Sequence, residues 1–308
     1  MIYTLTTNPN IDYYMNLRGP LVPGGINRSV HELLAPGGKG INVSLVLREL
    51  GKESSVLGYL AGLTGKLLQS MMESSGCQCR WFWLLQGQTR INTKINTSPE
   101  TAFNAGGPEL DDLAIAELCA FLRALQPEDT LVVSGNLQKS PAGAFAELLR
   151  AADQAGVALM VDTSGPALHD ALAFRPLLIK PNAEELGELF GEQARTPEQV
   201  LALARRAQRR GARNVLVSMG ADGALLAAED GAVYHARLRS AQPVVSTVGA
   251  GDSVTAGFLA GYLDSGEYAY ALRLGVACGS ATAYSECLAN AEKIREVWRS
   301  VEVSRQES

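Results

Sequence analysis

Short runs of aliphatic and β-branched residues alternate with amphipathic helical patterns along most of this chain, and this alternation limits the possible fold more than any other feature. Buried strands are predicted at residues 2–7, 54–60, 130–135, 158–163, 177–180 and 214–220. Helices are predicted between or after them at 110–125, 142–156 and 197–211. Such alternation favours a mostly parallel sheet covered by helices on both faces, and 308 residues suffice for one large α/β domain with an appendage.

Two polar segments, residues 11–35 and 87–108, interrupt this alternation. Both are rich in polar and β-prone residues, and both lack the continuous apolar character of a buried parallel strand. They predict either a small separate sheet that projects from the main body or ordinary surface loops. The last six residues, VSRQES, predict a frayed tail.

Composition excludes several classes of protein. The net charge of −5 argues against a nucleic-acid or anionic-membrane surface, and a hydrophobic content of 46% is that of an ordinary globular protein. The N-terminus lacks the pattern of a secretory signal, and no apolar run is long enough to span a membrane. The five cysteines form no C-x-x-C pair, which favours reduced thiols in a cytoplasmic protein.

The stretch STVGAGDSVTAGFL carries the strongest chemical signal. Gly249, Ala250 and Gly251 precede a helical pattern, so backbone N–H groups and the helix dipole would form an anion hole there. Asp252 could cap this helix, but a cap needs no Gly-Ala-Gly run. A carboxylate beside an anion hole suits phosphoryl transfer, in which Asp252 takes a hydroxyl proton.

A second glycine-rich stretch, PGGKGINV at residues 36–43, also precedes a helix. It matches neither the P-loop nor the G-x-G-x-x-G pattern. Gly37 and Gly38 would let a polar ligand approach the backbone, with Lys39 and Asn42 as hydrogen-bond donors to hydroxyls or phosphate. A simple helix-initiating turn is the alternative.

Polar residues elsewhere suggest a sugar phosphate. Asp12 follows the first strand and could bind sugar hydroxyls or form a turn. Arg90, Asn92 and Lys94 alternate, so on a strand they would share one face, to which Arg28 could add positive charge. The patch suggests a substrate phosphate, although a solvated strand face would show the same spacing.

Two further stretches suit a nucleotide. Lys180, Asn182 and Glu185 follow a strand and open a helix, where an amide and a carboxylate could orient waters around Mg²⁺. Ser218, Gly220 and Gly223 end another strand, where glycines would let a nucleotide lie against the backbone.

Together and in this order, the motifs resemble the ribokinase-like (PfkB) carbohydrate kinase family from about residue 2 to about residue 290. STVGAGDSVTAGFL is similar to the C-terminal signature of the family, and GGKGINVS to the N-terminal one. The resemblance implies a ribokinase-like three-layer sandwich forming a single domain over residues 1–308. Segments 11–35 and 87–108 would then form a β-sheet lid over the sugar, and a homodimer would pair through the lids.

The resemblance also implies roles for the residues named above. Asp252 would be the general base, with Gly249, Ala250 and Gly251 as the anion hole for the transferred phosphoryl group. The substrate would be held by Asp12, Arg28, Gly37, Gly38, Lys39, Asn42, Arg90, Asn92 and Lys94. ATP would be held by Lys180, Asn182, Ser218, Gly220, Gly223 and Gly251, and Glu185 would bind Mg²⁺ through water.

Within the family, TTNPNID, GQTRINTK and GINRSV resemble the hexose-phosphate branch. The implied reaction is the ATP-dependent conversion of fructose 1-phosphate to fructose 1,6-bisphosphate, with tagatose 6-phosphate and fructose 6-phosphate as alternative substrates. Asn136, Leu137 and Gln138 replace the family's Ser-Leu-Pro next to the expected sugar site, which leaves the exact sugar open. Two rival classes are a non-catalytic sugar-phosphate sensor, against which the intact Asp252 argues, and a dinucleotide oxidoreductase, whose fingerprint is missing.

Overall fold

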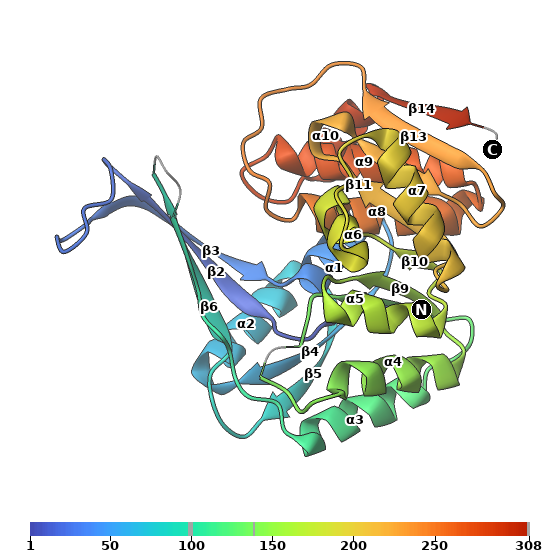
Figure 1. Ribbon diagram of the computed structural model, residues 1–308. Coiled ribbons are helices and arrows are strands. Elements are labelled where there is room, and N and C mark those ends of the chain that lie inside the picture. Colours follow the sequence, from blue (N-terminus) through green and yellow to red (C-terminus); the bar gives the residue numbers. More distant parts are fainter. Residues whose placement is uncertain (98–100, 138, 307–308) are drawn as a thin grey trace.

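The computed structural model describes residues 1–97, 101–137 and 139–306, and Gln138 lies outside this part of the chain. Ten strands form a large sheet, and seven neighbouring strands of it, from β5 to β11, are parallel, whereas β12, β13 and β14 add antiparallel pairs (Figure 1). In spatial order they are β14 (Val301–Gln306), β13 (Val233–Leu238), β12 (Ala224–Ala227), β11 (Asn214–Ser218), β10 (Leu178–Ile179), β9 (Ala158–Asp162), β8 (Thr130–Ser134), β1 (Ile2–Thr6), β4 (Ser55–Ala61) and β5 (Gln78–Leu84).

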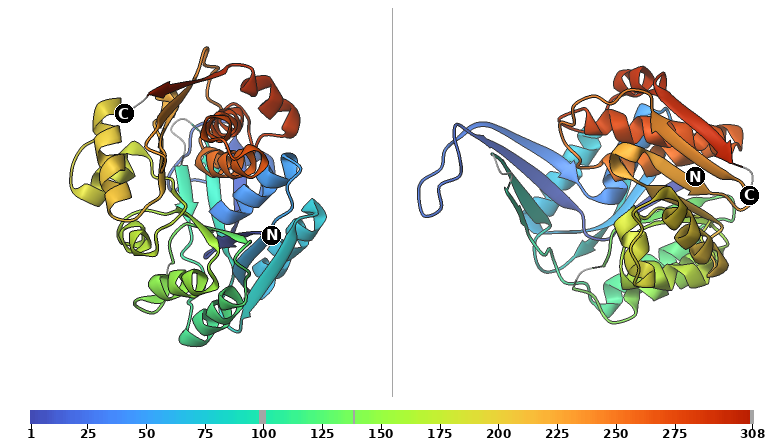
Figure 2. Two further views of the ribbon diagram at one scale, coloured as in Figure 1. Left: turned by 90° about the vertical axis from the view of Figure 1, so that its right-hand side faces the viewer. Right: turned by 45° about the horizontal axis from the view of Figure 1, so that its top comes forward.

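Helices cover both faces of this sheet, so the predicted three-layer α/β architecture is confirmed (Figure 2). One face packs against α3 (Asp112–Arg123), α4 (Ala144–Ala155), α5 (Pro166–Ala171), α6 (Ala183–Phe190) and α7 (Pro197–Arg209). The other packs against α1 (Lys39–Glu49), α8 (Ala250–Ser265), α9 (Tyr268–Ala283) and α10 (Ala291–Trp298). Fully buried side chains such as Leu118 on one face and Leu272 on the other make up the two halves of the core.

The two polar segments form a second, four-stranded sheet, which we call the small sheet, and the surface-loop alternative is wrong. Its order is β3 (Ser29–Gly37), β2 (Asn10–Leu17), β6 (Arg90–Asn96) and β7 (Thr101–Asn104). The central pair, β2 and β6, is parallel, and the outer pairs are antiparallel. The small sheet projects from the main body, and Ile11 at its base is buried against α1, β4 and α2 (Gly62–Ser75) (Figure 1).

The C-terminal residues correct one prediction. Residues 301–306, of which four belong to the expected frayed tail, form β14 and pair along β13. Val301 is buried against the core, while Glu302 is ion-paired with Arg239 at 2.6 Å. The polar composition that suggests a tail is also that of an edge strand with one solvated face. No helix within the described residues is long and apolar enough to cross a membrane.

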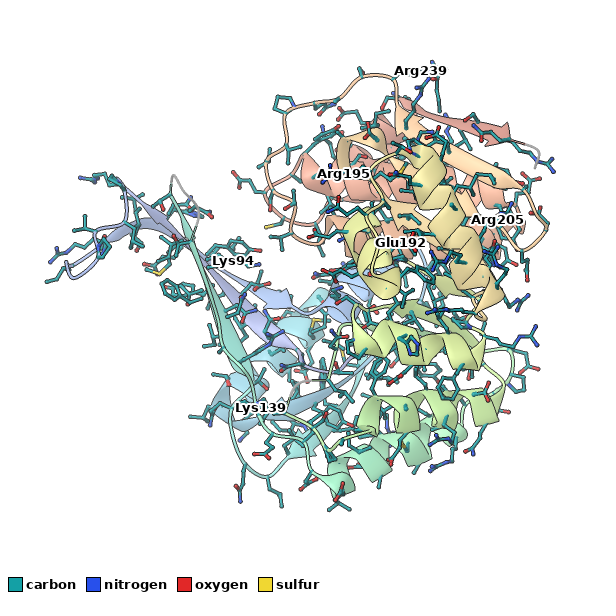
Figure 3. All side chains as sticks on the ribbon, viewed as in Figure 1. Lys94, Lys139, Glu192, Arg195, Arg205 and Arg239 are labelled. Carbon is teal, nitrogen blue, oxygen red and sulfur yellow. The ribbon has the colours of Figure 1, made fainter. Side chains whose placement is uncertain are left out.

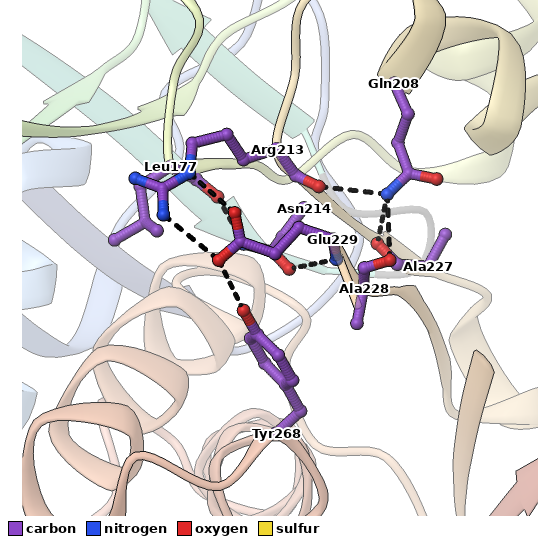
Figure 4. A network of polar contacts seen from close by, with 8 residues as sticks. All are labelled: Leu177, Gln208, Arg213, Asn214, Ala227, Ala228, Glu229 and Tyr268. Atoms are coloured by element: carbon purple, nitrogen blue, oxygen red, sulfur yellow. Dashed lines mark hydrogen bonds and ion pairs between the residues drawn. The ribbon is translucent and has the colours of Figure 1, made fainter. Parts of the chain in front are cut away.

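A polar network lies at the N-terminal end of β11, around Arg213 and Asn214 (Figure 4). Arg213 donates to both carboxylate oxygens of Glu229, at 2.7 and 3.1 Å, and Tyr268 at the start of α9 donates to the same carboxylate. The hydrogen bond from Arg213 is the main reason that the pKa of Glu229 lies below its usual value. Gln208 on α7 donates to three nearby backbone carbonyls, so the network joins α7, β11, β12 and α9.

Candidate active site

A cavity of about 820 Å³ lies at the carboxyl ends of the parallel strands, between them and the small sheet. Ligands in open α/β sheets bind at this end because the connecting loops gather there. Every residue predicted above for the site lines this central cavity except Gly37 and Arg28. The cavity therefore joins side chains from both sheets and from the N-termini of α1, α6 and α8.

Asp252 lies in the first turn of α8 and does not cap that helix. The cap is Gly249, which has a φ of 76° and makes no side-chain hydrogen bond. Asp252 is 6% exposed, and its carboxylate accepts a hydrogen bond of 2.8 Å from Asn42 Nδ2 on α1. Burial, reinforced by the negative charge of Asp162, raises the pKa of Asp252 to about 6. A carboxylate with this pKa is ionised at neutral pH and basic enough to take a proton.

Asp162 lies near Asp252 at the end of β9, and no sequence motif indicates it. Lys39 Nζ lies 3.3 Å from one of its oxygens and Lys180 Nζ lies 3.2 Å from the other. Burial alone would raise the pKa of Asp162, but the two lysines outweigh it and hold that pKa below its usual value. Its position after a buried strand is the same signal that identified other site residues.

The N-terminus of α1 faces the cavity together with that of α8. Gly38 precedes α1 with a φ of 123°, and a Cβ there would lie 2.5 Å from the Thr6 side chain, so glycine is required. Thr6 Oγ1 accepts a 2.9 Å hydrogen bond from the Ile41 amide, which fixes the first turn against β1. Two helix N-termini thus direct partial positive charge into one cavity.

The inner face of the small sheet supplies the polar groups opposite Asp252. Arg90, Asn92 and Lys94 alternate along β6 and all line the cavity, as their spacing predicts; Figure 3 labels Lys94. Lys94 Nζ lies 3.2 Å from Asp12 Oδ1 and donates to the Tyr14 hydroxyl at 3.1 Å. Arg90 donates to the Asn8 carbonyl at 3.0 Å, and burial lowers the pKa of Arg90. The solvated-face alternative fails, since Asn92 and Lys94 are buried.

Gly37 and Arg28 occupy positions that the prediction did not anticipate. A Cβ on Gly37 would lie 2.2 Å from Asn10 Nδ2 and 2.5 Å from Asp12 Oδ2, so these side chains lie over the glycine. Gly37 therefore makes room for them and does not itself line the cavity. Arg28 is exposed and belongs to the segment between β2 and β3. This segment forms the outer end of the small sheet (Figure 1).

The other end of the cavity lies between the starts of α6 and α8. Asn182 caps α6 by accepting from the Glu185 amide at 2.8 Å, while Glu185 accepts from the Asn182 amide at 2.9 Å, which is a capping box. Gly223 has a φ of 83°, and a Cβ there would lie 2.0 Å from the Ala236 carbonyl oxygen. Small or apolar side chains line this end, among them those of Ala224, Leu238, Val244, Val276 and Ala283.

Hard oxygen donors suited to a magnesium ion are present but sparse. Glu185 and Asp252 contribute carboxylates to the cavity, whereas both oxygens of Asp162 face lysines. Among the described residues, no three His, Cys, Asp or Glu side chains gather into a metal cluster. Mg²⁺ retains several waters and binds with one or two carboxylates plus substrate phosphates, so this donor set fits a magnesium ion that enters with a nucleotide.

The sequence relatives of this chain are carbohydrate kinases. The model of a family described as pfkB family carbohydrate kinase matches residues 6–293. A 1-phosphofructokinase of Bacillus subtilis is 39% identical over 306 residues, which cover 99% of this chain and 100% of that protein. A D-tagatose-1-phosphate kinase of Bacillus licheniformis is 31% identical over 312 residues and 99% of each chain.

Solved structures show the same fold over nearly the whole chain. Phosphofructokinase-2 from Escherichia coli, in complex with substrates and products, superposes with a TM-score of 0.90 at 28% identity, covering 97% of this chain and 98% of that chain. An Arabidopsis thaliana ribokinase complexed with ribose and ATP superposes with a TM-score of 0.77 at 21% identity, covering 97% and 98%, a likeness of fold alone.

Proposed function

Because this chain belongs to the pfkB family of carbohydrate kinases and is therefore a phosphotransferase, we propose that it transfers the γ-phosphoryl group of ATP to fructose 1-phosphate, giving fructose 1,6-bisphosphate. The observation that carries the proposal is the place of Asp252. Its buried carboxylate, with a pKa of about 6, lies beside the N-termini of α1 and α8, between a cationic end and an apolar end of one cavity.

The choice of a ketohexose 1-phosphate rests on the relatives and on the small sheet. The two relatives above are named for fructose 1-phosphate and tagatose 1-phosphate, which differ in the configuration of one ring carbon. Arg90 and Lys94 on β6 supply positive charge for the substrate phosphate at the end of the cavity remote from α6. Tagatose 1-phosphate is the second candidate, and tagatose 6-phosphate and fructose 6-phosphate rank below it.

In the proposed reaction, Asp252 takes the proton from the C6 hydroxyl of the sugar. The hydroxyl oxygen forms a bond to the γ-phosphorus, the bond from that phosphorus to the bridging oxygen breaks, and ADP leaves with the electron pair. Backbone N–H groups of Gly249, Ala250 and Gly251 stabilise charge on the transferred oxygens, with Lys39 and Lys180 nearby. Asn42 holds the carboxylate through its 2.8 Å hydrogen bond.

The nucleotide would occupy the apolar end of the cavity. The adenine ring suits the small side chains there, and the glycines after β11 allow a flat group to approach the backbone. Asn182, Ser218, Gly220, Gly223 and Lys180 line this end and would hold ATP. A magnesium ion would neutralise phosphate charge, with Glu185 holding it through water.

We further propose that the small sheet closes over the sugar as a lid and pairs with that of a second copy. Closure excludes water, which competes as a phosphoryl acceptor. The small sheet exposes Leu33, Leu34 and Phe103, which a partner could cover, and Arg28 would reach a substrate phosphate only through such an assembly. All five cysteines, each within the described residues, are free, which suits the cytoplasm.

The test is ADP release from ATP with fructose 1-phosphate, compared between the wild type and Asp252→Asn. We expect kcat to fall by several orders of magnitude in the variant, because the base is lost while the isosteric amide keeps a hydrogen bond to Asn42. Near-normal turnover by the variant would show that Asp252 is not the general base. Ranking the four sugar phosphates by kcat/KM tests the substrate, and fructose 1-phosphate in last place would contradict the proposal.

A further inference from the structure

Two asparagines in the sugar end of the cavity carry polar atoms that lack a partner within the described residues. Asn10 on β2 is 3% exposed and Asn92 on β6 is 7% exposed, and both line the cavity. Asn10 Nδ2, a donor, and Asn92 Oδ1, an acceptor, are both buried without a hydrogen bond. The other amide atom of Asn10, Oδ1, accepts a long hydrogen bond of 3.5 Å from Arg90.

Unpaired buried polar atoms are costly. Such an atom has lost its hydrogen bonds to water without replacement, so a folded chain keeps it where a bound ligand completes the hydrogen bond. The two atoms belong to neighbouring parallel strands on one face of the small sheet, because Asn10 is paired with Arg90 and Asn92 lies two residues further on. The backbone at Gly37 makes room for the Asn10 side chain, since a Cβ there would lie 2.2 Å from Nδ2.

We propose that Asn10 and Asn92 together bind one ring hydroxyl of the ketohexose phosphate and so determine which C4 epimer, fructose 1-phosphate or tagatose 1-phosphate, is the better substrate. The inference rests on the proposed function. A hydroxyl group donates one hydrogen bond and accepts others, so it satisfies the Asn92 oxygen and the Asn10 nitrogen at once. Asn92 is among the substrate residues that the family resemblance implies, whereas no role is implied for Asn10.

Discrimination follows from the direction of the hydroxyl. The two epimers differ only in the face of the ring from which the C4 hydroxyl projects. A donor and an acceptor held at fixed places on two strands meet that hydroxyl in one configuration, whereas the other leaves both atoms unpaired. A site built to hydrogen-bond a hydroxyl rejects a substrate that does not present it far more strongly than an apolar pocket can.

The experiment measures kcat/KM for both 1-phosphates in the wild type, Asn10→Ala, Asn10→Ser and Asn92→Ala. Tyr13→Phe is the matched control, because Tyr13 lies on the opposite face of β2 from Asn10 and Asp12. Its hydroxyl donates a hydrogen bond of 2.6 Å to Glu32 and takes no part in the cavity. We expect the wild type to favour one epimer. In each asparagine variant the ratio of kcat/KM between the two epimers should fall by on the order of 10-fold or more, while the control variant should keep the wild-type ratio.

Thermal unfolding of the unliganded proteins separates this role from a structural one. Asn10→Ala removes the unpaired Nδ2 and, with it, only the long 3.5 Å hydrogen bond that Oδ1 accepts from Arg90, so the variant should unfold close to the wild-type temperature while its epimer preference falls. Folded asparagine variants with wild-type preference would overturn the inference, as would a wild type that uses both epimers equally. A wild type that phosphorylates neither sugar would overturn the proposed function itself, and the inference with it.

Discussion

Asp252 and Asp162 show how neighbours decide the behaviour of a buried carboxylate. Both aspartates are buried at the ends of their elements in one cavity. Asp162 is flanked by Lys39 and Lys180 and has a lowered pKa, whereas burial and the charge of Asp162 raise the pKa of Asp252. Two acids with pKa values shifted in opposite directions are a frequent sign of a catalytic site, with the raised one suited to moving a proton.

The pH dependence of turnover should report this arrangement. The base must be ionised, so kcat/KM should fall as the pH drops through about 6 and Asp252 becomes protonated. Asp162→Asn removes a negative charge and leaves Lys39 and Lys180 free to stabilise the Asp252 carboxylate. The acidic limb of the profile should therefore move to lower pH in the variant. The pH–rate profile measures this directly, and a limb that stays in place or moves upward would contradict the assigned coupling.

The difference between these two aspartates also shows what the sequence can disclose about single residues. Asp252 is marked by the Gly-Ala-Gly run directly before it, which is a local sequence pattern. Asp162 ends an ordinary buried strand, and its importance depends on Lys39, 123 residues away. Contacts over such separations follow from the fold and are not visible in a local pattern. The role of Asn10 is not visible in the sequence for the same reason, because its Nδ2 is left unpaired only once β2 is placed beside β6 in the small sheet.

At the level of elements, the start of α6 serves two purposes. The capping box of Asn182 and Glu185 satisfies two backbone amides that would otherwise have no partner at the helix terminus. The same two residues line the cavity. The carboxylate of Glu185 therefore has a structural role in the helix cap and a proposed role in binding magnesium. A substitution that changes only one of these roles can separate them.

Glu185→Gln makes that separation, since glutamine also serves at this position of a capping box but carries no charge. Chemical denaturation should show stability within about 0.5 kcal/mol of the wild type, as for a preserved cap. The Mg²⁺ concentration for half-maximal activity should rise several-fold. The comparison variant Glu184→Gln changes the neighbouring acid of the same first turn and should leave the Mg²⁺ requirement unaltered. An unchanged requirement in Glu185→Gln would remove Glu185 from the metal site.

Helices and strands could be predicted where their sequence pattern is compatible with only one kind of secondary structure. The strands β1, β8, β9 and β11 are short runs dominated by aliphatic and β-branched residues, and the structure places each within one or two residues of its predicted bounds. β14 was missed because a polar edge strand and a frayed tail have similar composition. The sequence does not distinguish the small sheet from surface loops for a related reason, since its strands have polar residues on the face that lines the cavity.

At the scale of the whole molecule, the cavity depends on two sheets that are joined at a narrow base. The large sheet brings Asp252, Asp162 and the starts of three helices to one end, and the small sheet brings Asp12, Arg90 and Lys94 from the other side. The outer part of the small sheet has few contacts with the main body (Figure 1). That outer part exposes several large apolar side chains, which in a soluble monomer would be an unusual cost.

The proposed homodimer accounts for these exposed side chains and can be tested through them. Leu34 on β3 and Phe103 on β7 are 44% and 56% exposed, and the strand register puts both on the face of the small sheet opposite Asp12 and Lys94. Because arginine would bury charge in an apolar interface, a Leu34→Arg, Phe103→Arg double variant should sediment as a monomer where the wild type sediments as a dimer. Its KM for the sugar phosphate should rise, since Arg28 and the closed lid require the partner. Analytical ultracentrifugation with steady-state kinetics measures both, and a wild type that is monomeric at micromolar concentration would refute the pairing of lids.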